Sequence, residues 1–180
     1  MNKILGRGLI VLVWQGVLAA SVLGAGVPLI PNPKFTNGDL CIAKDKDFDE
    51  YRYDEDIAHC KRNVSKGRRD KIYENYKIPS RCRNDYTIDH FIPLSIGGNN
   101  HNENLWPEHK AIKAVRQNLE YDVYLDLRAA KITQKEAVGI IRTAKLNPPA
   151  DEVREELTDY TDCGPLQEIP SKQGPSEEEN

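Results

Sequence analysis

The spacing of apolar and polar residues along the chain alternates between helix-like and strand-like segments. Residues 68–76 carry three apolar side chains at helical spacing and are followed by Pro79, so we predict a helix that ends before the proline. Residues 85–94 are rich in β-branched and aromatic side chains, which is typical of a strand. Residues 97–100 read Gly-Gly-Asn-Asn and predict a turn, after which we expect a second short strand around residues 103–105.

Two further segments have the apolar period of a helix. In residues 107–128, Pro107 suits the first helical position, and apolar residues recur every three or four positions. Residues 133–146 begin with the capping-box pattern Thr-x-x-Glu and are followed by Pro148. We therefore predict two helices, with apolar faces formed by Ile112, Val115, Leu119, Val123 and Leu127 in the first and by Ala137, Ile140, Ile141 and Ala144 in the second.

Three other segments lack such a period. Residues 28–38 are rich in proline and asparagine, which favours an extended lead-in. Residues 39–56 are polar and acidic and are predicted to form a loop. From residue 164 onward the composition is dominated by Pro, Gly, Ser and Glu, which is typical of a tail that cannot bury a core.

The first residues of the chain have the three parts of a secretory signal peptide. Lys3 and Arg7 precede an uncharged apolar run at residues 8–23, and small residues follow. Sites near residues 19–21 and near Ala25 both fit cleavage, and an uncleaved membrane anchor is the alternative. We expect residues 1–25 to direct export to the periplasm or the medium, with no stable membrane insertion after cleavage.

The cysteine pattern agrees with an exported protein. The chain has four cysteines, none of them in a Cys-x-x-Cys pair, which disfavours a zinc ribbon. An even number behind an export signal favours disulfides, because that compartment is oxidising. Four buried thiols remain the alternative, and the residues alone allow three pairings of Cys41, Cys60, Cys82 and Cys163.

The net charge of −3 conceals a basic segment. Residues 59–83 hold nine lysines and arginines against two acidic residues, whereas residues 39–56 and 151–180 are acidic. A nucleic-acid-binding groove needs local rather than net positive charge. A solvated basic face would have the same composition, so charge alone does not decide between them.

The segment from Tyr86 to Lys113 carries the candidate chemistry. Asp89 and His90 are consecutive, so on a strand their side chains point to opposite faces. This arrangement suits a division of roles, with the carboxylate holding a cation and the imidazole acting on water.

This segment resembles the HNH nucleases, the ββα-metal or His-Me finger family that includes the colicin DNases. The Asp-His on the first strand of that family corresponds to Asp89 and His90, and its central asparagine corresponds to Asn104. The run from Asp89 to Pro107, with IPLS, IGG and NLWP in place, is similar to the small exported bacterial branch. The resemblance covers about a third of the chain.

The resemblance implies a role for each of these residues. His90 would be the general base that deprotonates the attacking water, since histidine can do this near neutral pH. Asp89 would be a ligand of one divalent cation, and Asn104 would support the loop of the hairpin. The reaction implied is hydrolysis of phosphodiester bonds in DNA, with RNA left open as a substrate, to give 5′-phosphate ends.

This sequence departs from the family pattern at the third position of the motif. The position of the last family histidine or asparagine holds Lys113, which has no free lone pair. His109 lies four residues earlier, on the same face of the predicted helix. We therefore expect His109 to complete the metal site with Asp89 and Lys113 to contact a phosphate. Mg²⁺ is the expected ion, while Mn²⁺, Ni²⁺ and Zn²⁺ would also suit such ligands.

The same resemblance extends to the cysteines and the basic segment. Similar small exported proteins carry a lead-in like GDLC and HCKRNVS, which implies a Cys41–Cys60 disulfide and leaves Cys82 with Cys163. Lysines and arginines just before the site would bind phosphates without contacting bases. We therefore expect binding with low sequence specificity and an affinity that falls strongly with salt concentration. The residues expected to bind nucleic acid are Arg62, Lys66, Arg68, Arg69, Lys71 and Lys113.

We therefore predict an α+β protein built on a disulfide-stabilised hairpin–helix module of the ββα-metal type, acting as a monomeric secreted endonuclease. The main rival is a module of the same fold that binds nucleic acid but is catalytically impaired. A third reading is an exported structural protein in which the Asp-His pair is incidental. The predicted organisation is a signal peptide (1–25), a basic lead-in (26–85), the nuclease module with its following helix (86–146) and an acidic, partly disordered tail (147–180).

Overall fold

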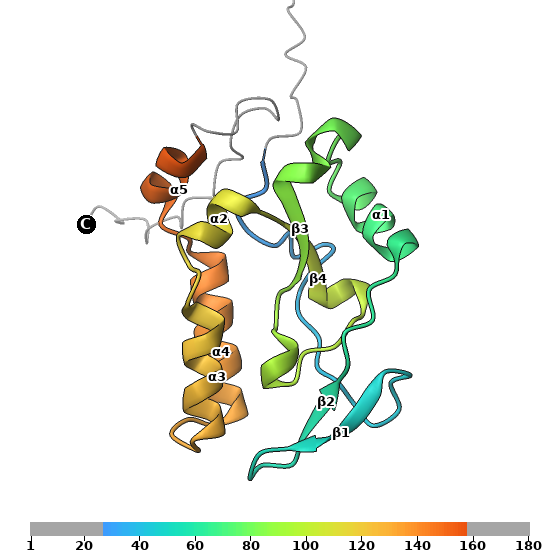
Figure 1. Cartoon of the computed structure of the whole chain (residues 1–180), viewed down its shortest axis with the longest axis vertical. Helices are drawn as coiled ribbons and strands as arrows, with labels where there is room; N and C mark the ends of the chain where they lie inside the picture. The colour runs from blue at the N-terminus through green and yellow to red at the C-terminus, as the bar shows by residue number, and fades with distance from the viewer. Residues whose placement is uncertain (1–26, 158–180) are drawn as a thin grey trace, which may run out of the picture.

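A computed structural model describes residues 27–157, which form two small antiparallel hairpins and a set of short helices (Figure 1). The α+β class is thereby confirmed. The strands are β1 (Phe48–Arg52), β2 (Ile57–Cys60), β3 (Tyr86–His90) and β4 (Leu105–His109). The helices are α1 (Lys66–Asn75), α2 (Lys110–Ala114), α3 (Leu119–Arg128), α4 (Gln134–Leu146) and α5 (Ala150–Glu156), with 3₁₀ turns η1 (Ser80–Asp85), η2 (Leu94–Ile96) and η3 (Asn102–Asn104).

The β3–β4 hairpin is the centre of the molecule, with α1 on one side and α2, α3 and α4 on the other (Figure 1). Its register pairs Tyr86 with His109, Asp89 with Trp106 and His90 with Leu105. Because paired residues point to the same face, His90 and His109 share one face, and Asp89 lies on the other.

Two apolar clusters hold these elements together. The larger one joins α1, β3, β4 and α2, and Trp106, Leu105 and Ile112 within it are fully buried. The smaller one joins β2, η2, α3 and α4 around Ile96 and Ile141. The hairpin is thereby fixed on both sides, which gives its polar residues defined positions.

The prediction of one helix over residues 107–128 was wrong. Pro107 lies within β4 opposite Ile88, which is tolerated because each strand of a two-stranded sheet is an edge. The helical part begins only at Lys110 and is interrupted by a turn before Leu119. The long-range strand pairing therefore overrides the local helical pattern, while Ile112 and two residues of α3 (Val123 and Leu127) are still buried.

Several local predictions are confirmed. The helix expected at residues 68–76 is α1, and Thr133 and Glu136 form both bonds of the capping box that starts α4. The segment at 39–56 was predicted as a loop, yet it contains β1. Ile140 was placed on the buried face of α4, but 43 % of it is exposed, whereas Ile141 is fully buried.

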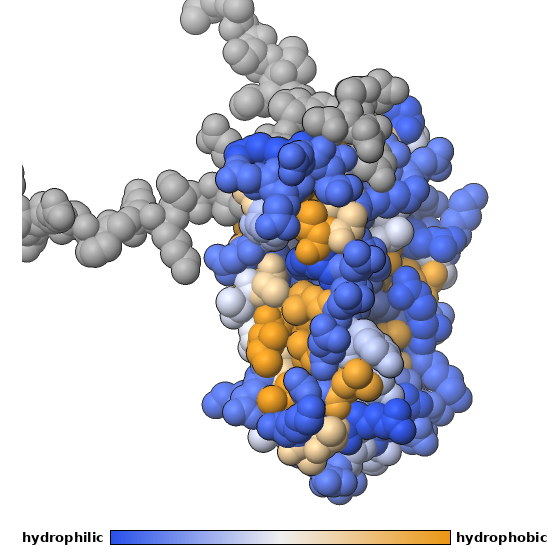
Figure 2. Space-filling view, turned by 60° about the vertical axis from the view of Figure 1, so that its left-hand side comes forward, coloured by the Kyte–Doolittle hydropathy of each residue, from blue (hydrophilic) through white to orange (hydrophobic). Residues whose placement is uncertain are grey.

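The surface of the molecule is mostly hydrophilic on the face seen in Figure 2, where an apolar band also lies exposed. Leu125 of α3 and Ile140 of α4 are among the large apolar side chains that stay exposed. No helix between residues 27 and 157 is long and apolar enough to cross a membrane.

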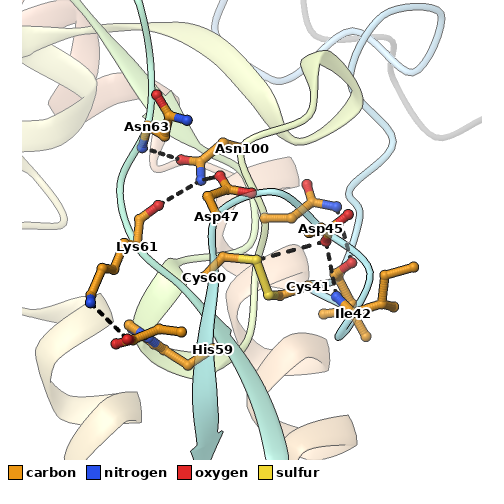
Figure 3. The surroundings of a disulfide bond; sticks show 12 residues. Cys41, Ile42, Asp45, Asp47, His59, Cys60, Lys61, Asn63 and Asn100 are labelled. Atoms are coloured by element: carbon orange, nitrogen blue, oxygen red, sulfur yellow. Dashed lines mark hydrogen bonds and ion pairs between the residues drawn. A yellow bond between two sulfur atoms is a disulfide. The ribbon is translucent and has the colours of Figure 1, made fainter.

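One predicted disulfide is present. Cys41 and Cys60 are bonded, and this bridge ties the lead-in to the end of β2 (Figure 3). Cys82 is fully buried. Its expected partner Cys163, like the predicted signal peptide and most of the predicted tail, lies outside the described residues. Within the part of the tail that is described, α5 buries Val153 against the core.

Candidate functional site

Asp89 and His90 are the last two residues of β3, and both are buried, at 6 % and 3 % exposure. Their side chains leave the strand on opposite faces, as the alternation along a strand requires. His90 faces the segment between β2 and α1, while Asp89 faces α2 and α4. The two groups therefore have separate surroundings.

The imidazole of His90 lies between an amide and a guanidinium. Its Nε2 is 3.0 Å from Oδ1 of Asn100, and its Nδ1 is 3.5 Å from the nearest guanidinium nitrogen of Arg62. Arg62 also donates to the carbonyl oxygen of Ile88 at 3.0 Å. Burial and then the charge of Arg62 lower the pKa of His90, against an opposing effect of the Asn100 bond. The ring is therefore held neutral.

The carboxylate of Asp89 is surrounded by two lysines and a second carboxyl group. Lys113 Nζ lies 3.1 Å from Asp89 Oδ2, and Lys145 Nζ lies 4.0 Å from it. Burial acts to raise the pKa of Asp89, but the neighbouring carboxyl of Glu108 and the two ammonium groups outweigh it and hold this pKa well below its usual range. Burial and the adjacent Asp89 raise the pKa of Glu108 to about 8. Asp89 is therefore the more acidic member of the pair, while the Glu108 carboxyl also contacts the guanidinium of Arg116.

The expected metal pair is not brought together. His109 is fully buried on the opposite face of the hairpin from Asp89, where its Nδ1 accepts the N–H of Ala111 and caps α2. Its ring also packs edge-on against Tyr86 at 4.8 Å between centroids. With ammonium groups already around Asp89, these residues do not fit a divalent cation in the arrangement described.

A second group with ligand-like spacing lies at the disulfide. Cys41, Asp45 and Cys60 place one candidate atom each within 4.8 Å of the others. Both sulfurs are in the disulfide, however, and the thiolate is the form that binds metals. The oxidised protein therefore offers only the Asp45 carboxylate there.

Asn104 holds the loop between the strands. Its Oδ1 accepts the Ile92 N–H at 2.8 Å, and its Nδ2 donates to the carbonyl oxygens of Ile92 and Asn99, each at 2.9 Å. Gly98 packs in the same loop, and a Cβ there would clash with the Ile92 carbonyl oxygen. Gly97 has a positive φ of 93°, which a glycine adopts at little cost.

The predicted nucleic-acid-binding residues are divided by the fold. Arg62 contacts His90, and Arg68 donates to the backbone oxygen of Asn100, so both adjoin the imidazole side of the site. Lys113 lies on the other side, against Asp89. The remaining three are exposed on α1: Lys66, Arg69 and Lys71.

Three buried polar residues of the site were missed by sequence reasoning. Asn100 was taken as part of a turn and Glu108 as part of a helix, and Lys145 was not singled out within the helix predicted at residues 133–146, yet all three are at most 2 % exposed. Each contacts a group far away in sequence, so no local pattern marks them.

The chain was compared with known proteins. No protein-family model, curated protein or solved structure matches it.

Proposed function

We propose that this protein is an endonuclease that hydrolyses phosphodiester bonds of DNA with low sequence specificity. The observation that carries the proposal is the surroundings of His90, a buried imidazole oriented by Asn100 and facing Arg62. The resemblance of residues 89–107 to the HNH nucleases supports the same assignment. RNA is a second substrate to be tested.

The chemistry follows from the positions of these groups. His90 Nδ1 takes a proton from a water molecule, whose oxygen attacks the phosphorus. The bond from phosphorus to the 3′ oxygen breaks, the leaving oxygen takes a proton from solvent, and a 5′-phosphate and a 3′-hydroxyl result. Arg62, which is exposed and adjacent to Nδ1, balances the charge that gathers on the phosphate.

The basic segment supports binding of the polyanion. Arg62 and Arg68 adjoin the imidazole side of the hairpin, and α1, which carries Arg68, has further exposed cations, so that together they can contact phosphates flanking the scissile bond. Such contacts carry no sequence information and weaken steeply with salt. Export to an oxidising compartment is compatible with the Cys41–Cys60 disulfide.

The metal ion enters the proposal only through the family resemblance. A divalent ion, with Mg²⁺ first, is implied by the resemblance to HNH nucleases, but Lys113 and Lys145 surround the carboxylate that was expected to hold it. The hydrolytic step described above therefore uses only groups of the chain itself. Cleavage in EDTA against cleavage in Mg²⁺, Mn²⁺, Ni²⁺ or Zn²⁺ decides this point.

One observation favours the rival function, a module that binds nucleic acid without cleaving it. His90 is only 3 % exposed and Arg62 covers its Nδ1, so water reaches the nitrogen only if Arg62 turns toward a phosphate. A binding module predicts salt-sensitive affinity for DNA with no nicking in any metal.

A plasmid-nicking assay on the oxidised protein tests the proposal. We expect supercoiled DNA to be nicked by the wild type and by His59→Ala, a control that removes a histidine outside the site whose Nδ1 lies 3.8 Å from the Asp49 carboxylate. His90→Ala should bind DNA with unchanged affinity and lose nicking. Equal nicking by His90→Ala would refute the role of this imidazole, and binding without nicking by the wild type would support the binding module.

A further inference from the structure

The hydrogen bond between His90 and Asn100 has a direction that is fixed by the surrounding groups. Asn100 is fully buried in the loop between η2 and η3. Its Nδ2 contacts the Asp47 carboxylate and the carbonyl oxygen of Lys61, which can only accept. Its Oδ1 lies 3.1 Å from the backbone N–H of Asn63, which can only donate. These partners leave one orientation of the amide, with Oδ1 toward the imidazole.

That orientation selects one tautomer of the His90 ring. An amide oxygen cannot donate, so Nε2, at 3.0 Å from Oδ1 of Asn100, must carry the proton. Arg62 leads to the same tautomer from the other side of the ring, since its guanidinium has no acceptor and lies 3.5 Å from Nδ1. Arg62 is on an exposed side chain that can turn toward a phosphate, so it does not hold this tautomer by itself, and the buried Asn100 is the neighbour that fixes the lone pair on Nδ1.

We propose that Asn100 is a positioning residue, which holds His90 in the tautomer whose Nδ1 lone pair faces Arg62 and the phosphate-binding side of the molecule. The inference deepens the proposed nuclease function and rests on it. A general base needs its accepting nitrogen directed at the water it deprotonates, and a second group usually fixes that direction.

Three partners of Asn100 lie at the two ends of the β1–β2 hairpin, which the disulfide tethers: Asp47 precedes β1, and Lys61 and Asn63 follow β2. Lys61 and Asn63 directly follow Cys60, and the N–H of Lys61 donates to the carbonyl oxygen of Asp47 at 2.8 Å. Figure 3 shows these groups arranged around the Asn100 amide, next to the Cys41–Cys60 bridge. The disulfide thus fixes the strand end that orients the amide, and the amide orients the imidazole.

The first test is spectroscopic and needs no substrate. Long-range ¹H–¹⁵N correlation spectra of the oxidised, ¹⁵N-labelled full chain report which ring nitrogen of each histidine carries the proton. We expect His90 to show a protonated Nε2 and a bare Nδ1 in the wild type. A protonated Nδ1 in neutral His90 would overturn the inference, whatever the variants do.

The second test compares two neighbouring buried asparagines. Asn100→Ala should give His90 a mixture of tautomers and lower kcat roughly tenfold to a hundredfold, part of the 10²–10⁴ that a general base contributes, with KM for DNA little changed. Asn99→Ala is the control, because Asn99 is equally buried but bonds to Asp39, Leu40 and His101 and not to His90. It should leave the tautomer unchanged.

The outcomes separate this inference from the function on which it rests. If the wild type nicks DNA and Asn100→Ala nicks it equally, or keeps the tautomer unchanged, the positioning role is refuted. If the tautomer responds as expected but the wild type nicks no DNA in any metal or in EDTA, the proposed function fails while the hydrogen-bond assignment is supported. Should Asn100→Ala not fold, the wild-type spectrum alone still decides the tautomer.

Discussion

Replacement of Lys145 by methionine tests the buried charge network directly. Its side chain is 2 % exposed, and its Nζ donates to the His90 carbonyl oxygen at 2.7 Å and to Glu120 at 2.5 Å. It also lies 4.0 Å from Asp89. Methionine has nearly the same volume, so Lys145→Met removes the charge and the bonds without opening a large cavity.

The expected loss of unfolding free energy depends on which interactions Glu120 and Asp89 retain after Lys145 is replaced. The Glu120 side chain is 37 % exposed and regains water, whereas the Asp89 side chain is only 9 % exposed and keeps Lys113 as its ammonium partner at 3.1 Å. Removal of one member of a buried ion pair costs about 3–5 kcal/mol. Because Lys113 still balances Asp89, we expect the lower end, about 3 kcal/mol of unfolding free energy.

Urea unfolding of the oxidised protein measures this change, with the m-value required to stay constant. The matched control is Lys131→Met, since Lys131 also pairs with an aspartate, at 2.8 Å, but its side chain is 68 % exposed. The control should leave the unfolding midpoint unchanged. A loss below about 1 kcal/mol for Lys145→Met would refute the view that this network is desolvated.

Further predictions concern the loop, the pH dependence and the disulfide. Gly98→Ala should cost about 3 kcal/mol because its Cβ would meet the Ile92 backbone oxygen, whereas Gly139→Ala, with open space around it, should not destabilise α4; thermal unfolding compares them. The bond to Asp39 and the nearby acidic groups raise the pKa of His101, so its stabilisation is fully present below the unfolded value of about 6.5 and is lost as pH rises through the folded pKa. The difference in Tm between wild type and His101→Gln should therefore be larger at pH 5.5 than at pH 8.5, and an equal difference would contradict this. Replacement of both bridged cysteines by serine should cost about 3 kcal/mol for a 19-residue separation, and unchanged stability would show that the bridge constrains nothing.

Local signals in the sequence predict the local structure well. The capping box at Thr133 and the proline after α1 mark their helices because both act through neighbouring backbone groups. The prediction of one helix over residues 107–128 failed because a long-range contact determines the structure there. Pro107 pairs across the hairpin with Ile88, and no local spacing reports a ladder partner nineteen residues away.

Some residues of the candidate site could likewise be predicted from local sequence, whereas others could not. Adjacent Asp89 and His90 could be recognised from their motif, and their opposite directions follow from strand geometry. Asn100 and Lys145 could not be recognised, because their partners are ten to fifty-five residues distant and a buried polar residue has no sequence signature. His109 was misplaced since its face depends on the strand register, which the predicted helix had replaced.

The most direct test of the account is single-turnover cleavage of a fluorescent DNA duplex, with protein in excess and binding measured by anisotropy on the same samples. We predict cleavage to 5′-phosphate ends by the wild type, and a rate at least about a hundredfold lower for His90→Ala at equal affinity. Equal rates for the two proteins, or tight binding by the wild type without cleavage, would contradict the account.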